Sequence, residues 1–366
     1  MPHVDPDALT AFAEEVLVEI GTPPDRAADV ADSLVSADLS GHSSHGTRQL
    51  HSKYAREAED GRIDPGAEPV VENAEGVAAT VDGRLAFGQL VGRTAVDAAV
   101  ERADEHGVGV VGLKRTSHIG RIGEWAERAC DAGVAFAAFV CNPGSRWVSP
   151  PGSAERRFST NPVSVGVPTF DALEFPLVVD VATSQVAHGK IRERAAAGHE
   201  LAAEWAVDDA GEPIRDARRF EEDGAGGMLP LGGRVAGYKG FGLSVLSELL
   251  AANVADGTVS GMDDVIWGNH AAFVAIDLSR FTSRERTAER AAAMAEYVRA
   301  TDFSADLGPG AAAMGEETLL PGEAEHRARK RHRTDGVPVS GADAAAFDEF
   351  ARDVGVDEGS IPAPFR

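Results

Sequence analysis

The segment Gly41–Arg48 (GHSSHGTR) brings two imidazoles and one guanidinium together over a short stretch of chain. Histidine gains and loses a proton near neutral pH, so His45 could exchange the proton of a substrate hydroxyl group. Arg48 could hold a carboxylate through two parallel hydrogen bonds, with Ser44 as a further polar contact. Together with a nicotinamide that accepts hydride, these groups would suit the oxidation of a 2-hydroxyacid.

The same histidines also allow a metal site, because His42, His45 and His51 form a cluster. Histidines three residues apart can share one face of a helix, and imidazole is a common zinc ligand. No nearby carboxylate completes a ligand set, so we expect no bound metal, and a metal-dependent hydrolase or lyase is the alternative. A third interpretation is that these histidines only cap helices or fill the core.

A second histidine motif, Thr116–Gly120 (TSHIG), follows an apolar run that predicts a strand. Side chains that contact ligands collect at the carboxyl ends of strands in α/β layers. His118 is therefore a rival acid/base group, or a group that orients the ligand. The alternative is that Ser117 caps a helix and that His118 is incidental.

Three further segments carry residue types that bind phosphate or ribose. Asp180 ends an apolar strand and two hydroxyl residues follow it, where backbone N–H groups at the start of a helix could meet pyrophosphate oxygens. A glycine-rich loop, Leu231–Gly242, carries Lys239 towards the start of an apolar helix. The turn Pro321–Glu323 is the third segment. Helix caps and ordinary surface turns would produce the same patterns.

The pattern Gly107–Gly112 (GVGVVG) matches the G-x-G-x-x-G fingerprint of Rossmann folds, and Asp131 follows where an acidic residue would be expected. That fingerprint needs its glycines in the turn between a strand and a helix. Here the glycines lie inside an apolar run, and the next helix cannot begin before about Gly120. We therefore expect small residues that let a helix pack closely on a strand, and no Rossmann site.

The hydrophobic periodicity predicts an α/β or α+β protein in which helices flank a sheet. Asp5-Pro6 starts the first helix and Gly21 stops it, while Gly41 ends the second. Apolar, β-branched runs bounded by glycine predict strands further along the chain. The expected helices are 6–20, 24–39, one that carries Leu50 and Tyr54, 89–105, 279–297 and 342–354; the expected strands are 76–83, 108–113, 134–140, 163–167, 177–181 and 272–276; and 302–315 is expected to be a loop.

The chain of 366 residues is strongly acidic, with 59 Asp plus Glu against 35 Lys plus Arg and a net charge of −24. Such a surface stays soluble in strong salt, where screening shortens the range of charge repulsion. We therefore suspect a salt-loving source, with an ordinary acidic enzyme as the alternative. The same charge argues against nucleic acid or an anionic membrane as a partner. Lysine occurs only at Lys53, Lys114, Lys190, Lys239 and Lys330.

The cellular compartment follows from what the sequence lacks. Its longest apolar stretches are too short for a bilayer-spanning helix, and its first residues have no signal-peptide pattern. The two cysteines, Cys130 and Cys141, fit neither a disulfide framework nor a zinc site, and we expect them to be buried thiols. We expect a cytoplasmic protein.

Six segments, taken together and in this order, resemble the type 2 malate/L-lactate dehydrogenase family. That family includes malate, sulfolactate and ureidoglycolate dehydrogenases, diketogulonate reductase and a reductase of the cyclic imine piperideine-2-carboxylate. The resemblance implies an NAD(P)-dependent oxidoreductase that interconverts a small 2-hydroxyacid and its 2-oxoacid, with an imine or diketo-acid reductase as the alternative on the same fold. The segments are Ala37–Gly46 (ADLSGHSSHG), Ser117–Ala129 (SHIGRIGEWAERA), Ser159–Pro168 (STNPVSVGVP), Val178–Ile191 (VVDVATSQVAHGKI), Leu229–Leu250 (LPLGGRVAGYKGFGLSVLSELL) and Leu319–Glu323 (LLPGE).

The resemblance also implies an architecture and an assembly. It indicates a homodimer and a non-Rossmann fold whose central, predominantly antiparallel sheet is flanked by helices and binds NAD or NADP in an extended groove. A helical domain is built from both chain ends. We expect residues 1–75 and 325–366 to form this helical domain, 76–118 to connect it on the substrate side, and 119–324 to bind the nicotinamide cofactor.

By position, His45 matches the family's usual proton donor, and His118 matches the histidine that some members use instead, so the choice between them stays open. Many members have an arginine four residues after the first of these histidines, where this chain has Gln49 beside Arg48. The loop Asp209–Gly227 has no clear counterpart in the family. The catalytic residues expected are His45, His118 and Asp180, and the substrate-binding residues are Ser44 and Arg48.

The cofactor residues are likewise implied by the resemblance. The Rossmann rule on acidic residues does not apply to this fold, so the sequence does not separate NAD from NADP. Arg146, Arg156 or Arg157 could accept a 2′-phosphate. The cofactor-binding residues expected are Asn142, Thr160, Asp180, Ala182, Thr183, Ser184, Lys239, Gly240, Gly322 and Glu323.

Overall fold

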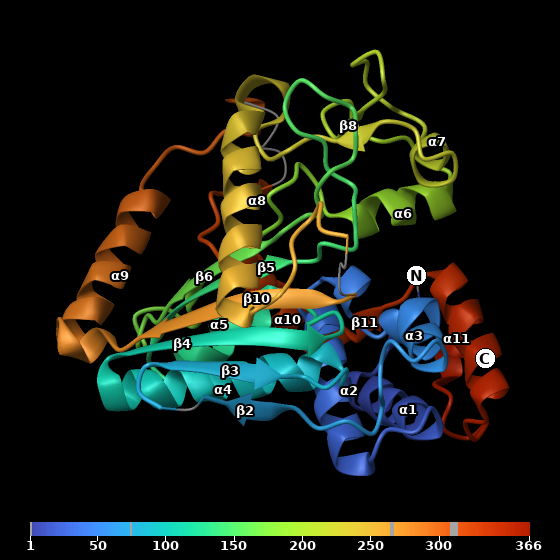
Figure 1. The fold of residues 1–366 in the computed structure, drawn as a ribbon, viewed down its shortest axis with the longest axis horizontal. Coiled ribbons are helices and arrows are strands. Elements are labelled where there is room, and N and C mark those ends of the chain that lie inside the picture. The colour runs from blue at the N-terminus through green and yellow to red at the C-terminus, as the bar shows by residue number, and fades with distance from the viewer. Residues whose placement is uncertain (1, 74, 264–266, 308–313) are drawn as a thin grey trace.

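The structure, a computed structural model, describes residues 2–73, 75–263, 267–307 and 314–366. At its centre is a seven-stranded sheet in the order β2-β3-β4-β10-β5-β6-β7 (Figure 1). The pair β3 and β4 is parallel and the other neighbours are antiparallel, which confirms the predominantly antiparallel sheet. The strands are β2 (Val70–Glu72), β3 (Ala78–Asp82), β4 (Val108–Thr116), β5 (Ala135–Cys141), β6 (Val163–Val167), β7 (Leu177–Val181) and β10 (Asn269–Ile276).

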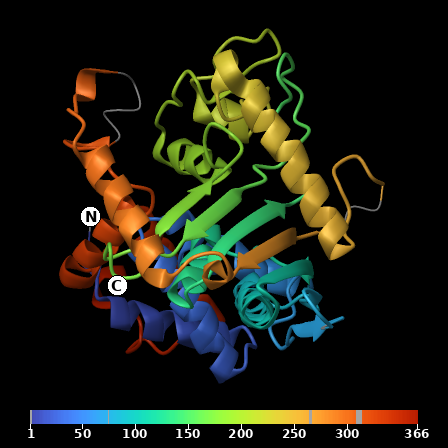
Figure 2. The same ribbon diagram turned by 90° about the vertical axis from the view of Figure 1, so that its left-hand side faces the viewer.

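Helices cover the sheet on both faces. The helices α4 (Gly88–His106) and α5 (Ile122–Asp131) bury their apolar sides against one face, where Trp125 and Phe136 are almost fully buried. The long helix α8 (Gly233–Ala255) crosses the other face (Figure 2). The helix α9 (Arg284–Arg299) stands apart from α8 at the far side of the sheet, after the 3-10 turn η3 (Leu278–Arg280).

Both chain ends build one helical body with its own core, as expected. The helices α1 (Pro6–Glu19) and α2 (Pro24–Leu39) pack with α11 (Gly341–Val354) and the 3-10 turn η6 (Ala363–Phe365). The ring of Phe12 contacts the rings of Phe347 and Phe365 at centroid distances of 5.7 and 5.5 Å. The strands β1 (His3–Val4) and β11 (Val337–Pro338) pair antiparallel, and α10 (Glu323–Asp335) leads into β11.

A smaller lobe lies beyond the sheet edge and has a separate apolar core. It contains α6 (His188–Ala197), α7 (Ala217–Glu221) and the short pair β8 (Ala206–Val207) and β9 (Gly227–Met228). The guanidinium of Arg156 donates to the carbonyls of Phe220, Ala225 and Gly226, which ties this lobe together. The Nε and Nη2 donors of Arg156 therefore serve the fold.

Most expected elements are confirmed, and the differences have local causes. The helix predicted from residue 279 begins at Arg284, because Ser283 caps it through the Arg286 N–H. The chain around Leu50 is a π-helical turn, η2 (Leu50–Tyr54), followed by α3 (Ala55–Glu59). The loop predicted for 302–315 contains the 3-10 turn η4 (Ala305–Leu307), and its residues 308–313 lie outside the described part of the chain.

The glycine-rich segment Leu231–Gly242 was expected to be a loop, but most of it lies within helix α8, which begins at Gly233 and kinks at Ala236. Lys239 therefore lies within the helix, after the kink.

No helix in the described ranges is both long enough and apolar enough to span a bilayer. Cys130 and Cys141 are buried free thiols, as expected.

Two of the three glycines of the G-x-G-x-x-G pattern, Gly109 and Gly112, serve packing, as predicted, and the third ends a helix. Gly107 ends α4 in a left-handed conformation, with a φ of +87°. A Cβ on Gly109 would collide with the carbonyl oxygen of Ala99 in α4. A Cβ on Gly112 would collide with the carbonyl oxygen of Val254 in α8. The strand β4 is thus pressed between helices on its two faces.

Replacing Gly112 with Ala tests this close approach. The added methyl group meets backbone, which cannot rotate away, so we expect the free energy of unfolding to fall by about 1–3 kcal/mol. Gly341→Ala is the matched control, because nothing lies within 4 Å of its Cβ position, and it should change stability by less than about 0.5 kcal/mol. Denaturant unfolding at constant high salt measures both. Equal effects would contradict tight packing of β4 on α8.

Candidate functional site

A pocket of about 230 Å³ opens where the helical body, the sheet and the small lobe meet. Residues from at least six separate segments reach it, which explains why no single motif defines it. The side chains that matter below are His42, Ser44, His45, His118, Arg121, Asn142, Thr160, Asp180, Ala182, Lys190 and Asn269.

The turn η1 (Ser43–His45) presents the first histidine and is held by Asp38. The buried carboxylate of Asp38 accepts hydrogen bonds from the N–H and Oγ1 of Thr47, at 2.8 and 2.7 Å. Gly46 lies so close to this carboxylate that a Cβ would collide with it. Burial raises the pKa of Asp38 to about 7, and the two bonds from Thr47 oppose this rise. Asp38 thus closes the chain between residues 38 and 47 into a fixed loop.

His45 and His118 face each other across the pocket, with ring centroids 5.3 Å apart. The Nδ1 of His45 lies 3.0 Å from the Oγ of Ser44, and the Nδ1 of His118 lies 3.2 Å from the Oη of Tyr54. Burial, with smaller contributions from His42, Lys53 and Arg121, lowers the pKa of His45 to about 3. Burial also lowers the pKa of His118 well below its ordinary value. Both rings are therefore neutral at pH 7.

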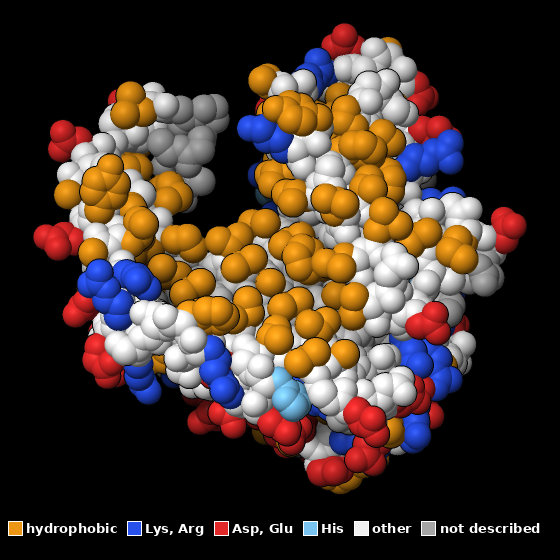
Figure 3. Space-filling view, turned by 60° about the vertical axis from the view of Figure 1, so that its left-hand side comes forward, with side chains coloured by type: hydrophobic (Ala, Val, Ile, Leu, Met, Phe, Trp, Pro, Cys, Tyr) orange, Lys and Arg blue, Asp and Glu red, His pale blue; other side chains and the backbone are white. Residues whose placement is uncertain are grey.

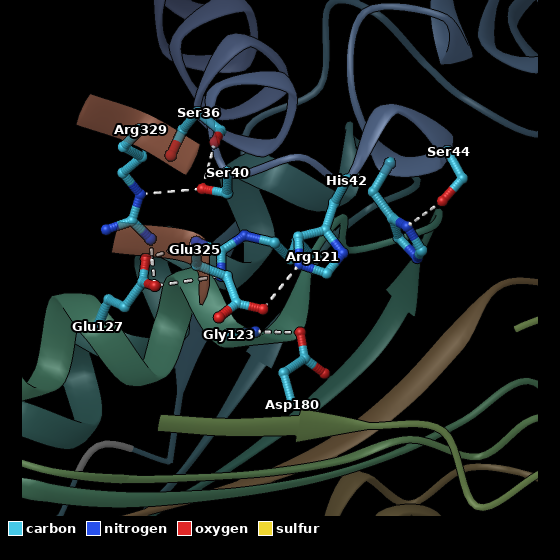
Figure 4. Close-up of polar contacts among 11 residues, drawn as sticks. Ser36, Ser40, His42, Ser44, Arg121, Gly123, Glu127, Asp180, Glu325 and Arg329 are labelled. Carbon is cyan, nitrogen blue, oxygen red and sulfur yellow. Dashed lines mark hydrogen bonds and ion pairs between the residues drawn. The ribbon is translucent and has the colours of Figure 1, made fainter. Parts of the chain in front are cut away.

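Arg121 is the N-cap residue of α5 and lines the pocket, and its guanidinium is paired with a carboxylate of the same helix (Figure 4). Its guanidinium meets the Glu127 carboxylate at 2.5 and 3.2 Å. Burial works against the charge of Arg121, but Glu127 holds its pKa above the ordinary value. Glu127 is shared with Arg329 of α10, which also donates to the Oγ of Ser40 at 2.9 Å. This network joins α5, α10 and the end of α2 behind the pocket.

Two carboxylates complete the polar wall. Asp180 in β7 accepts the N–H of Gly123 at 2.7 Å, and burial raises its pKa, against that bond and Arg121. The Nε2 of His42 lies 3.1 Å from the Glu325 carboxylate at the start of α10 (Figure 4). The pocket wall therefore carries two neutral imidazoles, the half-buried carboxyl group of Asp180 and the buried guanidinium of Arg121.

The structure brings part of the expected site together. His45, His118, Asp180, Ser44, Asn142, Thr160 and Ala182 all line the pocket. Thr183 and Ser184 are buried beside it, with their hydroxyls donating to the carbonyls of Thr160 and Val186. The remaining cofactor candidates, Lys239, Gly240, Gly322 and Glu323, lie outside the pocket.

Three of them, Gly240, Gly322 and Glu323, lie near β7 instead, whereas Lys239 is exposed on α8. Gly240 packs against the backbone of Leu231 and Thr183, and a Cβ there would collide with both. Gly322 starts α10 with a φ of +87° and lies against Pro176. The buried carboxylate of Glu323 accepts the N–H of Leu320 at 3.0 Å and is paired with arginines, so it holds the start of α10. The close backbone packing at Gly240 and Gly322 and the carboxylate of Glu323 thus support the chain around β7.

Arg48 does not occupy the place that sequence reasoning gave it. Its guanidinium lies 3.1 Å from Asp343 and 3.4 Å from Glu193 and lines a separate cavity of about 710 Å³. Successive side chains of a tight turn point in different directions, so Arg48 faces away from His45. The expectation that Arg48 anchors the substrate carboxylate is therefore not supported by this geometry.

Sequence reasoning missed three residues of the pocket. Lys190 lines it, and its ammonium group makes no ion pair or hydrogen bond with the part of the chain that is described. Asn269 accepts the N–H of Ile119 at 3.0 Å and donates to the Cys141 carbonyl at 3.1 Å, which positions the segment after His118. Arg121 is the third. Lys190 and Arg121 lie within the segments that carry the family resemblance. Each is close in sequence to a histidine, His188 and His118 respectively, and this closeness could have marked them as pocket residues.

The histidine cluster proposed as a metal site is not one. His42 pairs with Glu325, His45 faces His118, and His51 packs against the ring of Phe347 at 4.8 Å. Across residues 2–73, 75–263, 267–307 and 314–366, no group of three or more His, Cys, Asp or Glu side chains is placed to share a metal ion. The three rings serve different neighbours.

Comparison with known proteins agrees with this site and fold. The family model for malate/L-lactate dehydrogenase matches residues 4–347. Hydroxycarboxylate dehydrogenase B of Escherichia coli K12 is 31% identical over 365 residues, covering 98% of this chain and 96% of its own. Malate dehydrogenase of Pyrococcus abyssi is 30% identical over 370 residues, with 97% and 95% covered.

A solved E. coli structure described as a malate/lactate dehydrogenase superposes with a TM-score of 0.89 at 30% identity. It covers 99% of this chain and 98% of its own. The match therefore includes the helical body, the sheet and the small lobe together. The chain belongs to the malate/L-lactate dehydrogenase family, whose members are oxidoreductases acting on hydroxyacids.

Proposed function

We propose that this protein interconverts a small 2-hydroxyacid and its 2-oxoacid, with NAD or NADP as the redox partner. The observation that carries the proposal is the pair of neutral, half-buried histidines that face each other across one pocket, with ring centroids 5.3 Å apart. Such a pair supplies a proton acceptor and a hydrogen-bond donor for one substrate oxygen. His45 is the proposed proton acceptor, in line with its place in the family.

The pocket wall fits a nicotinamide. The Oδ1 of Asn142 is buried there without a hydrogen-bond partner among the described residues, and a carboxamide N–H₂ would satisfy it. Asn142, Thr160 and Ala182 would hold the ring, and Asp180 borders the same wall. When bound, the cofactor accepts hydride in oxidation and supplies it in reduction. The chain's own part is to orient the substrate carbon and to move the hydroxyl proton.

The substrate carboxylate requires a cation that is still available. Arg121 is already paired with Glu127, and Arg48 is paired outside the pocket. Lys190 lines the pocket without an ion pair to any described residue, so it is the proposed anchor. A charge-assisted bond to one carboxylate would orient malate, lactate or sulfolactate alike.

Turnover of a 2-oxoacid tests the proposed function. We expect oxidation of NADH or NADPH with one member of a panel of oxaloacetate, pyruvate, sulfopyruvate, 2,3-diketogulonate and piperideine-2-carboxylate. His45→Gln should lower kcat by about 10²–10⁴-fold, the scale of a lost acid/base group. A loss below about fivefold, with His118→Ala far worse, would transfer the role to His118. No turnover and no cofactor binding would refute the function.

Lys190→Met tests the carboxylate anchor. We expect KM for the 2-oxoacid to rise roughly 10–100-fold, the scale of a lost charge-assisted hydrogen bond, while kcat changes less. Lys330→Met is the matched control, because Lys330 pairs with the exposed Glu174 at the surface. An unchanged KM in Lys190→Met, together with a large increase in Arg48→Met, would return the anchor to Arg48.

We also propose that the protein is a homodimer that works in strong salt. Apolar side chains gather in the concave surface between α8 and α9, over the open face of β6 and β7 (Figure 3). Leu246 is 64% exposed, Val165 44% and Val179 40%, a continuous apolar surface unusual for a monomer. In a chain of net charge −24, salt screening would let two copies meet there.

Leu246→Glu tests this interface. A carboxylate on this apolar surface should convert the dimer to a monomer in sedimentation at high salt, because burying it unpaired is costly. Val77→Glu is the control, since Val77 is 42% exposed on the segment before β3. A wild-type protein that sediments as a monomer at all salt concentrations would contradict the dimer.

A further inference from the structure

The two histidines of the pocket differ in what occupies their Nδ1 atoms. The Nδ1 of His118 lies 3.4 Å from the backbone N of Gly120 and 3.2 Å from the Oη of Tyr54. A backbone N–H can only donate, so the Nδ1 of His118 must offer its lone pair. A neutral imidazole has one N–H, and it is therefore on Nε2.

Tyr54 reinforces this arrangement. Its side chain is fully buried in η2, and its Oη accepts a hydrogen bond of 2.7 Å from the Nε2 of Gln89 in α4. Burial raises the pKa of Tyr54, so the phenol keeps its proton. With Gln89 donating to the oxygen, the phenol proton points to the Nδ1 of His118. Gln89 is 1% exposed, so water does not compete for this chain of hydrogen bonds.

The Nε2 of His118 is left facing the pocket. No group in the described parts of the chain bonds to it, and His118 lines the pocket wall. The charged or titratable neighbours that act on His118 are Lys53 and His45, and both lower its pKa, after burial. The ring thus stays neutral and presents an N–H to any oxygen that enters the pocket.

His45 is not restricted in the same way. Its Nδ1 contacts the Oγ of Ser44 at 3.0 Å, and a hydroxyl group can accept as well as donate. His45 can therefore carry its proton on Nδ1, bonded to Ser44, and present a lone pair at Nε2. Among the two facing rings, His45 is free to be the base, whereas His118 is already a donor.

We propose that the relay Gln89–Tyr54–His118 fixes His118 as an Nε2–H donor to the reacting oxygen of the substrate, which assigns the proton transfer to His45. This inference rests on the proposed function and deepens it. In oxidation, a bound oxidised nicotinamide would take up the hydride, that is, the hydrogen of the substrate C–H bond with its electron pair. The hydroxyl proton passes to the Nε2 of His45, and the C=O bond forms while His118 holds the oxygen. Reduction reverses each transfer.

Tyr54 and Gln89 are then positioning residues, which act through His118 and touch no substrate. A donor role for His118 predicts different effects on kcat for two substitutions of this residue. Glutamine can replace an Nε2–H donor with its amide N–H₂, but it cannot take up a proton. His118→Gln should therefore keep kcat within about tenfold of wild type, while His118→Ala should lose about 10²-fold or more, the effect of a missing oxyanion donor. At His45, both substitutions should be equally severe.

The direct test is nitrogen-15 NMR of the unliganded protein labelled in histidine, with the His118 signals identified from the His118→Gln variant. We expect a protonated Nε2 and an unprotonated Nδ1. An Nδ1–H form of His118 in the wild type overturns the proposal, as does a His118→Gln variant as inactive as His118→Ala. Because the NMR needs no substrate, it stands even if no 2-oxoacid is turned over, which separates the two failures.

Tyr54→Phe removes one donor to Nδ1 while Gly120 remains. It should add an Nδ1–H population to the His118 spectrum and lower kcat about five- to tenfold, the usual effect of one hydrogen bond, with KM nearly unchanged. Tyr297→Phe is the matched control, because Tyr297 is 76% exposed on α9. A Tyr54→Phe protein with the wild-type thermal transition and an unchanged His118 spectrum would show that the relay does not set the tautomer.

Discussion

The buried carboxylate of Asp38 is the constraint on which the site depends. The turn that presents His45 contains only three 3-10 residues and has no regular backbone ladder of its own. Two hydrogen bonds from Thr47 to Asp38 close this turn, and the missing Cβ of Gly46 permits the approach. Because α2 is packed in the helical core, the position of Asp38 is fixed, and its two hydrogen bonds with Thr47 in turn fix the turn that carries His45. A buried carboxyl group is costly, and its two donors compensate for that cost.

The pocket lies between three bodies that each have a separate apolar core. Charged contacts join them: Glu127 of α5 meets Arg329 of α10, and Arg48 of the helical body meets Glu193 of α6 in the small lobe. Apolar packing thus sets the shape of each body, whereas charged contacts set how the bodies meet around the substrate. Strong salt weakens exposed ion pairs far more than buried ones, so the buried character of Arg121 and Glu127 suits an acidic protein.

The local signals in the sequence predicted most of the fold. Asp5, Gly21 and Gly41 mark helix ends through caps and φ values that depend on near neighbours, and the glycines of β4 were correctly read as packing positions. His118 and Asp180 were found because both follow apolar strands. The direction of Arg48 could not be predicted, because it depends on Glu193, which lies 145 residues away in sequence. Tyr54 was predicted to lie in an ordinary helix, because no sequence pattern indicates the π-helical turn in which it lies.

The helical body has a consequence for how the chain folds. Its helices α1 and α2 share one core with Phe347 and Phe365, and the ring of Phe12 contacts both of these rings. This core is complete only when segments far apart in the sequence have met. Contacts between distant segments cost more loop entropy than local contacts, and they slow folding. The turn of His45 therefore gains its support from the helical core only after this long-range docking, whereas the individual helices can form earlier.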